Sequence, residues 1–249
     1  MKKAFGIDVG GTGIKGAIVD VEHGELLTER RKFLTPKPAT PDAVIKEAKN
    51  LLKSFDWKKG VVGIGFPAVV INGICKSAVN IDKKWINFPV KEAFEQACGN
   101  PVSVINDADA AGIAEMKFGA GMGVKGSVLM LTLGTGIGSS LFIDGKLIPN
   151  IEFGQLVYKK SVAEHYGSNK HREQLKLSWK DWGASLNGVI KYYEKVCHPE
   201  LIILGGGVSK KFDSFSAFLK LDAPVIPAKL LNGAGTIGAA YYAVAKSKK

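Results

Sequence analysis

The segment FGIDVGGTGIKGAIVD (residues 5–20) has the pattern of an apolar strand, a turn rich in glycine and a second strand. Its central tetrapeptide, Gly11-Thr12-Gly13-Ile14, recurs as Gly134-Thr135-Gly136-Ile137 within VLMLTLGTGIGSSLFIDG (residues 128–145). In both copies an apolar strand precedes the turn and another follows it. The sequence therefore predicts two β-hairpins of the same kind, far apart in the chain.

Strand and helix patterns alternate along the rest of the chain. Strands are expected at residues 25–35, 61–70, 101–107, 200–204 and 224–228, and helices at residues 42–55, 89–98, 108–121, 178–196 and 235–247. Such alternation is typical of an α/β protein. Because a hairpin comes first in each half, we expect two related α/β lobes with a central cleft. The smaller lobe is residues 1–108 with a closing helix at about 235–249, and the larger lobe is residues 109–234.

Composition narrows the class of protein. The chain has 249 residues, of which 46% are hydrophobic, which is ordinary for a globular protein with a sizeable core. No stretch approaches the roughly 20 apolar residues of a membrane helix, and Asp8 interrupts the apolar start that a secretory signal needs. Three scattered cysteines favour a reducing compartment, and no Cys/His spacing predicts structural zinc. We therefore expect a cytoplasmic protein without a membrane segment.

The glycine turns and the basic charge both favour an anionic ligand. Glycine lets a phosphate approach backbone N–H groups closely, and Thr12 and Thr135 add hydroxyl donors. A third turn, Gly205-Gly206-Gly207, is expected between a strand and the start of a helix, whose partial positive charge favours an anion. The net charge of +11 attracts polyanions such as nucleic acid, acidic lipid or a phosphate-rich small substrate. The alternatives are that the glycines only form tight turns and that the lysines only solvate the surface.

Two acidic positions stand beside these elements. Asp8 comes shortly before the first turn, where a carboxylate near phosphate needs a cation such as Mg²⁺ between them, unless it is only a turn residue. Asn106-Asp107 ends a strand and precedes a helix. Asp107 could accept a hydroxyl proton there or cap the helix, a role that Asp109 could also take.

Five motifs carry a resemblance to a known family. They are GIDVGGTGIKG (6–16), VINDADAAG (104–112), LTLGTGIGSSLF (131–142), IPNIEFG (148–154) and ILGGGVSKK (203–211). Together, and in this order, they resemble the ROK sugar kinases, in particular the branch of polyphosphate glucokinases. The resemblance implies the actin-like ATPase (ribonuclease H-like) fold, with one phosphate-binding hairpin in each lobe. It also implies phosphoryl transfer from inorganic polyphosphate, ATP or both to the 6-hydroxyl of glucose, by a cytoplasmic homodimer.

The resemblance also implies roles for individual residues. Asp107 would be the general base, and Asp8 would help to hold Mg²⁺. Donor phosphates would be bound by Gly10, Gly11, Thr12, Lys15, Gly134, Thr135, Gly136, Gly205, Gly206 and Gly207. The sugar would be bound by Gly65, Phe66, Pro67, Asn80, Asn106, Glu152 and Gln155. A groove for the anionic chain would be lined by Lys15, Lys83, Lys84, Lys210 and Lys211.

The acceptor motif departs from the family pattern. The family reads Glu-x-Gly-His-Leu-Glu where residues 152–157 read Glu-Phe-Gly-Gln-Leu-Val. Gln155 can still exchange hydrogen bonds with a hydroxyl, whereas Val157 cannot, and one missing bond to a buried hydroxyl costs about 1–3 kcal/mol. Weaker use of glucose, preference for another hexose or an amino-sugar, and a weakly active sugar- or phosphate-binding regulator are the three outcomes. The intact Asp107 argues against the regulator.

Two non-enzymatic hypotheses are less consistent with the sequence. ROK repressors carry a helix-turn-helix domain before the kinase-like body, and here the first strand is expected from about residue 3. We therefore expect no nucleic-acid partner. An actin-like filament protein would have no use for Asp107 or for Asn80 and Glu152.

Overall fold

The computed structural model describes residues 2–247, which form two compact units. Of the described residues, unit 1 comprises 2–114 and 233–247, and unit 2 comprises 115–232. The division falls inside helix α3 (Asp107–Phe118), after Ala114. Among the described residues, no helix has both the length and the apolar character needed to cross a bilayer.

The sheet of unit 1 is built around the first hairpin. Its strand order is β3-β2-β1-β5-β8, with β4 also paired to β2. The hairpin strands β1 and β2 are antiparallel, whereas β1, β5 and β8 are parallel. The strands are β1 (Lys3–Gly10), β2 (Gly13–Asp20), β3 (Glu25–Leu26), β4 (Arg31–Phe33), β5 (Val62–Phe66) and β8 (Val102–Asn106); a separate pair is formed by β6 (Val70–Ile71) and β7 (Ile74–Cys75).

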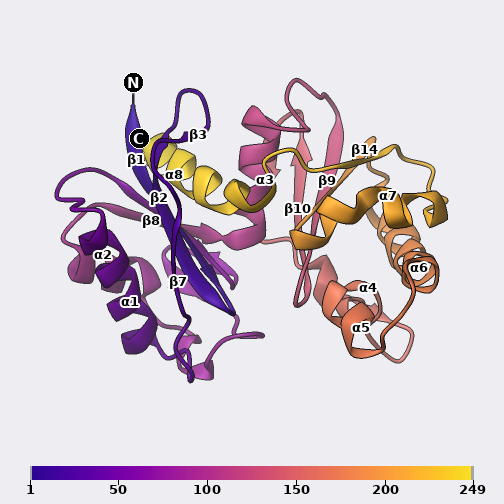
Figure 1. The fold of residues 1–249 in the computed structure, drawn as a ribbon, viewed down its shortest axis with the longest axis horizontal. Helices are drawn as coiled ribbons and strands as arrows, with labels where there is room; N and C mark the ends of the chain where they lie inside the picture. The colour runs from indigo at the N-terminus through magenta and orange to yellow at the C-terminus, as the bar shows by residue number, and fades with distance from the viewer. Residues whose placement is uncertain (1, 248–249) are drawn as a thin grey trace. The chain divides into compact units, whose positions relative to one another are not determined.

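Helices cover both faces of this sheet (Figure 1). On one face, α1 (Pro41–Ser54) and α2 (Val90–Cys98) pack their apolar sides on alternate residues of the central strands. This core includes Phe5, Ile64 and Phe66, all fully buried. The opposite face carries α8 (Ala234–Lys246), the yellow helix of Figure 1, which contacts β1, β5 and β8. A 3-10 turn, η1 (Lys83–Trp85), precedes α2.

Glycines permit the close packing of α8. A Cβ on Gly6 would lie 2.0 Å from the carbonyl oxygen of Thr236, and one on Gly63 would lie 1.8 Å from that of Ala239. Likewise, a Cβ on Gly238 would lie 1.7 Å from the carbonyl oxygen of Ala110 in α3. Real Cβ atoms do not approach backbone so closely, so the backbones of sheet and helices meet because side chains are missing there.

Unit 2 repeats the strand order of unit 1. Its sheet runs β11-β10-β9-β14-β15, with an antiparallel hairpin β9–β10 and parallel strands β9, β14 and β15. The strands are β9 (Ser127–Leu133), β10 (Ile137–Ile143), β11 (Lys146–Ile148), β14 (Leu201–Gly205) and β15 (Val225–Pro227), and a small pair is β12 (Val157–Tyr158) with β13 (Ser161–Val162). The repeated topology confirms the α/β class and the two lobes expected from the two hairpins.

Helix α6 (Trp179–Cys197) supplies most of the helical core of unit 2. Its buried face includes Trp182, Leu186 and Tyr193, which pack with apolar residues of β9 and β14. The shorter elements are η2 (Phe153–Gln155), α4 (Glu164–Gly167), α5 (Asn169–Gln174), η3 (Gly207–Lys211), α7 (Phe212–Phe215), η4 (Ser216–Phe218) and η5 (Leu231–Gly233).

Two local expectations were wrong. The single strand expected at residues 25–35 is divided into β3 and β4, because Thr28 Oγ1 accepts the N–H of Ile18 (3.1 Å) and so interrupts regular pairing. The helix expected directly after Gly207 begins instead as the 3-10 turn η3.

Candidate active site

Parallel pairing brings the candidate residues of unit 1 to one edge of its sheet. The carboxyl ends of parallel strands meet at the same edge, where open α/β sheets bind ligands. In register, Asp8 of β1 lies opposite Gly65 of β5, and Phe66 lies opposite Asn106 of β8. The first glycine turn, the 65–67 turn and Asn106-Asp107 therefore follow neighbouring strands.

The first glycine turn exposes backbone donors. Gly11 and Thr12 are exposed, and within residues 2–247 their N–H groups have no hydrogen-bond partner. The Gly10 carbonyl accepts the hydroxyl of Thr35, which anchors the turn. Asp8 and Lys15 face each other across β1 and β2, with Lys15 Nζ 3.4 Å from Asp8 Oδ2. The site thus places one cation and one carboxylate directly beside two free N–H groups.

The helix following β8 is capped by Asn106. Its Oδ1 accepts the N–H groups of Ala108 (2.9 Å) and Asp109 (3.1 Å), and its Nδ2 donates to the Ala68 carbonyl (3.3 Å). Asp109 is itself buried, so it is no accessible cap. The next residue, Asp107, is only partly buried and begins α3, where the helix dipole favours an ionised carboxylate. Asp107 Oδ1 also accepts the N–H of Ala108 (2.8 Å), so the carboxylate of Asp107 is held at the start of α3, at this edge of the sheet.

The 65–67 turn adjoins Asp107, but not through the Phe66 side chain. A Cβ on Gly65 would lie 3.6 Å from the Asp107 Cα, so the two residues are immediate neighbours, separated by the width of an ordinary van der Waals contact. Phe66 is fully buried and packs on Trp85 with ring centroids 4.6 Å apart. The expected aromatic wall is thus part of the core, and only the Phe66 backbone and Pro67 remain to line a sugar pocket. Asn80 is exposed, in a loop after β7.

In unit 2, two of the glycine turns lie side by side. Gly205 pairs with Thr132 of β9, and a Cβ on Gly206 would lie 2.5 Å from the carbonyl oxygen of Leu133, the residue before the second hairpin turn. Gly206 has φ +82°, a conformation that favours glycine. Gly207 is exposed, and Lys210 and Lys211 follow it, both exposed.

In the second hairpin turn, one backbone N–H group is already hydrogen-bonded within the turn itself. The N–H of Gly134 bonds to the carbonyl of Gly136 (3.0 Å), so Gly134 does not offer a free donor. The N–H groups of Thr135 and Gly136 have no partner within residues 2–247. Of the three residues expected to bind phosphate here, two therefore present donors.

The Glu152 segment is fastened to the strand that follows this turn. Ser139 Oγ donates to the Ile151 carbonyl (2.7 Å) and accepts the N–H of Phe153 (2.9 Å). A Cβ on Gly154 would lie 2.2 Å from the Ile137 carbonyl oxygen, so this glycine lets η2 lie directly on β10. The second hairpin turn and the Glu152-Phe153-Gly154-Gln155 motif are therefore one local structure.

The sequence reasoning missed a second carboxylate here. Glu164, at the start of α4, is buried, and its Oε2 accepts the N–H of Ile137 (3.3 Å). Burial and the neighbouring Glu164 charge both raise the pKa of Glu152. Val157, in contrast, is 74% exposed on β12. The family motif gave no signal for Glu164, which lies twelve positions beyond Glu152 in the sequence.

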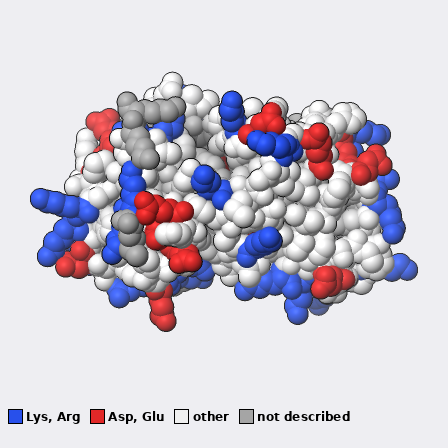
Figure 2. Space-filling view, turned by 90° about the horizontal axis from the view of Figure 1, so that it is seen from above, with Lys and Arg blue, Asp and Glu red and all other residues white. Residues whose placement is uncertain are grey.

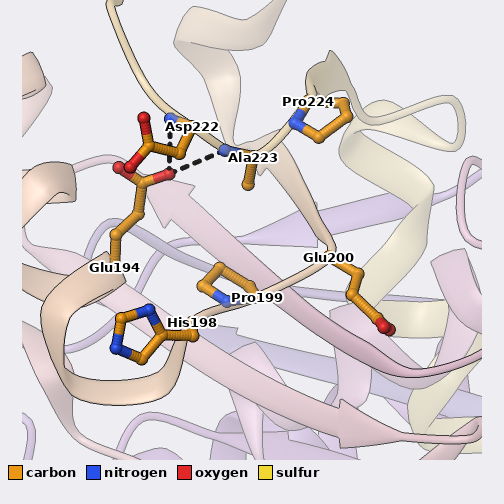
Figure 3. Close-up of a pocket in the computed structure, with 7 residues that line it drawn as sticks. All are labelled: Glu194, His198, Pro199, Glu200, Asp222, Ala223 and Pro224. Carbon is orange, nitrogen blue, oxygen red and sulfur yellow. Dashed lines mark hydrogen bonds between the residues drawn. The ribbon is translucent and has the colours of Figure 1, made fainter.

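A separate pocket of about 290 Å³ lies at the other end of the unit 2 sheet (Figure 3). It is lined by residues from the end of α6 and the loop before β15. Glu194 Oε1 accepts the N–H groups of Asp222 (3.0 Å) and Ala223 (2.9 Å), the dashed bonds of the figure. Glu200 pairs with Ser127 at the start of β9, whereas the glycine turns follow the strand ends. This pocket is thus not part of the candidate site.

The repeated strand order and the glycine turns at the strand ends define a two-lobed protein with the actin-like ATPase fold. Residues 4–150 match the ROK family, and the chain belongs to that family.

One relative and two solved structures show how similar this chain is to known proteins. The polyphosphate glucokinase of Mycobacterium tuberculosis is 42% identical over 245 residues, covering 98% of this chain and 92% of the relative. The crystal structure of inorganic polyphosphate/ATP-glucomannokinase from Arthrobacter sp. strain KM is 43% identical, with a TM-score of 0.96, covering 99% of this chain and 100% of that one. A ROK family glucokinase from Streptomyces griseus, solved with glucose and AMPPNP, is 27% identical over 98% and 100% of the chains, with a TM-score of 0.84.

Proposed function

We propose that this protein is a sugar kinase that transfers the terminal phosphoryl group of inorganic polyphosphate or ATP to the 6-hydroxyl of glucose. The new bond joins the sugar oxygen to phosphorus, and the bond from that phosphorus to the bridging oxygen breaks. The shortened polyphosphate, or ADP, leaves. The observation that carries the proposal is Asp107, a partly buried carboxylate held in the first turn of α3, beside Gly65 at the carboxyl edge of the unit 1 sheet.

In this proposal Asp107 accepts the proton of the attacking hydroxyl. Asp107 lies in the first turn of α3, where the helix dipole favours negative charge, the form that a base requires. Each unit offers N–H donors for phosphate oxygens on its own glycine turn: Gly11 and Thr12 in unit 1, and Thr135 and Gly136 in unit 2. Phosphoryl transfer depends mainly on such positioning and charge neutralisation, so one base and two donor turns are a sufficient set.

The residues of unit 1 fit a role for Mg²⁺. Among residues 2–247 no cluster of three or more His, Cys, Asp or Glu side chains could hold a metal. Mg²⁺ in kinases needs only one or two carboxylates, because substrate phosphates and water complete its shell. Asp8, partly exposed beside the first glycine turn, is the carboxylate that would hold it, and Lys15 already lies beside Asp8. When bound, the ion would neutralise charge on the donor phosphates.

The sugar site draws on Glu152, Gln155 and Glu164. Two carboxylates on one side of the second hairpin offer acceptors to several hydroxyl groups. We propose that Glu164 supplies the acceptor that the family pattern places at Val157. Mannose is the second candidate acceptor, because Gln155 departs from the family pattern and the Arthrobacter structure is that of a glucomannokinase. We further propose that the protein acts as a cytoplasmic homodimer that does not bind nucleic acid, and sedimentation equilibrium would test the dimer.

The decisive experiment is a coupled kinase assay of the purified protein. Glucose, mannose and an amino-sugar are each paired with long-chain polyphosphate, tripolyphosphate and ATP, with and without Mg²⁺. Sugar 6-phosphate formation from glucose is the expected result. Absence of product from every donor and sugar would refute the proposed function.

Replacing Glu152 by glutamine is expected to stabilise the fold while weakening sugar binding. A raised pKa means that the folded protein disfavours the ionised carboxyl, so this charge lowers stability at neutral pH. That cost disappears as pH falls through the raised pKa of the folded state. The Glu152→Gln variant should therefore unfold at a higher temperature than wild type at pH 7, and the difference should vanish in acid.

The same variant should raise the KM for glucose about tenfold, because an amide accepts hydroxyl hydrogen bonds less strongly than a carboxylate. Thermal unfolding at several pH values and steady-state kinetics measure the two effects. A lower unfolding temperature at pH 7 would contradict the raised pKa.

A further inference from the structure

Residues 159–172, which we term the basic segment, concentrate positive charge next to the second hairpin turn. The segment reads KKSVAEHYGSNKHR and holds four Lys or Arg and two His. Its one acid, Glu164, is buried and bonded to Ile137. On the face that Figure 2 presents, acidic side chains are dispersed among the basic ones. The cations of this segment take no part in the phosphoryl transfer proposed above.

The backbone of the basic segment is hydrogen-bonded to the second hairpin turn, residues 134–136. The N–H of Lys170 donates to the Gly134 carbonyl (3.0 Å). Ser168 holds this part of the segment in place. Its Oγ accepts the N–H of His171 (3.2 Å), and its carbonyl accepts the Nε1–H of Trp182 (3.1 Å). The backbone of Lys170 is thus held beside the two free N–H groups of Thr135 and Gly136.

The cations of the segment continue outward from the turn. Lys170 is exposed and has no ion-pair partner within residues 2–247. Tyr166 lies between the two ends of the segment, with its ring 6.2 Å from that of His171 and 5.4 Å from Lys159 Nζ. Lys159 and Lys160, both exposed, form the tip of the β12–β13 hairpin. Lys170 and Lys159 therefore form a basic track that starts at the second hairpin turn. His171 lies beside it, but burial and the neighbouring His165 lower the pKa of His171, so the lysines supply the charge.

Arg172 contributes less to this track. Its guanidinium carbon lies 4.1 Å from the centroid of the Trp179 ring, and its Nε donates to Asn169 Oδ1 (3.1 Å). Glu173 lies 3.8 Å from the same guanidinium and partly offsets its charge. Within residues 2–247, the lysines of the segment, unlike Arg172, have no acidic side chain within ion-pair distance.

We propose that the basic segment is a subsite for the distal phosphates of a long polyphosphate donor. The inference rests on the proposed function, since it extends the donor site at residues 134–136. A linear polyanion that begins at this turn can continue over Lys170 and on to Lys159 and Lys160. Tripolyphosphate and ATP carry too few phosphates to reach the far end, so the subsite selects for chain length.

The test compares donors of different length. Lys170→Ala and the triple variant K159A/K160A/K170A are assayed with long-chain polyphosphate and tripolyphosphate, at low and physiological salt. The measured quantity is the KM for long-chain polyphosphate divided by the KM for tripolyphosphate. From the usual strength of an exposed ion pair, we expect this ratio to rise about threefold in Lys170→Ala and about twentyfold in the triple variant. The difference should shrink as salt is added.

The matched control is Lys146→Ala. Lys146 is exposed at the opposite end of the β9–β10 hairpin, about 20 Å from the glycine turn at the rise of a β-strand. Its KM ratio should equal that of wild type. An unchanged ratio in the triple variant, or an equal rise in Lys146→Ala, would overturn the subsite.

Direct binding separates this inference from the proposed function. Equilibrium binding of long-chain polyphosphate to wild type and to the triple variant is measured without sugar. If no donor yields product, the proposed function fails, yet weaker binding by the triple variant alone would still support the subsite. If product forms and the variant binds the long chain like wild type, the subsite fails while the kinase stands.

Discussion

Replacing Asp107 by asparagine is expected to lower kcat for glucose phosphorylation by about a hundredfold to ten-thousandfold, the usual contribution of a general base. Asparagine keeps the size and polarity of the side chain but cannot accept the hydroxyl proton at neutral pH. The capping bonds made by Asn106 stay in place, and an asparagine Oδ1 at position 107 can still accept the N–H of Ala108, so the fold and α3 should be unaffected. Steady-state kinetics with each donor measure the effect.

The matched control for this variant is Asp42→Asn. Asp42 also lies in the first turn of a helix of unit 1, and it is exposed in α1. Its variant should retain wild-type kcat, and the KM for sugar should change little in Asp107→Asn. Full activity in Asp107→Asn, with the unfolding temperature unchanged, would remove Asp107 from the mechanism.

The Gly63→Ala variant is expected to lose at least about 3 kcal/mol of unfolding free energy or to fail to fold, since overpacking against rigid backbone ranks among the costliest changes. The added methyl group would lie 1.8 Å from the carbonyl oxygen of Ala239, and neither the central strand β5 nor α8 can retreat locally. Urea unfolding followed by circular dichroism gives the loss.

Gly65→Ala is the matched comparison for stability. Gly65 lies two residues along the same strand on the same side, but its added Cβ would meet only ordinary contacts, the nearest at 3.5 Å. Its unfolding free energy should stay within about 1 kcal/mol of wild type. Equal losses in the two variants would show that glycine flexibility, and not the close approach of α8, sets the requirement at Gly63.

Much of the fold was predictable because its signals are local. The two hairpins, α1, α6 and α8 each arise from apolar spacing within one segment, and the order of these segments implied two similar lobes. The prediction of a single strand at residues 25–35 was wrong because the Thr28 hydroxyl, in place of a backbone carbonyl, accepts the N–H of Ile18. The residues around Thr28 give no sign of this contact.

The candidate site was predictable only where a motif is contiguous. Glu164 reaches the second hairpin because α4 packs against it, and the sequence near Glu164 carries no mark of that contact. Phe66 looked available because it lies in a Gly-Phe-Pro turn, yet alternation along β5 turns its ring into the aromatic core. The hydrogen bond from the Lys170 N–H to the Gly134 carbonyl likewise joins residues that are far apart in the sequence, so neither local motif predicts it.

The position of α8 at the end of the sequence has a consequence for synthesis on the ribosome. Unit 2 is one uninterrupted stretch of the chain. In unit 1, by contrast, helix α8 covers the sheet at Gly6 and Gly63, and the residues of α8 are synthesised after unit 2. Nascent chains halted after Asn232 should therefore be cut by protease within residues 3–106 and resist cleavage within residues 127–205; equal resistance would contradict this order. The lobe that begins to emerge first would thus be the last to mature, and its early strands would need protection while the other half is being translated.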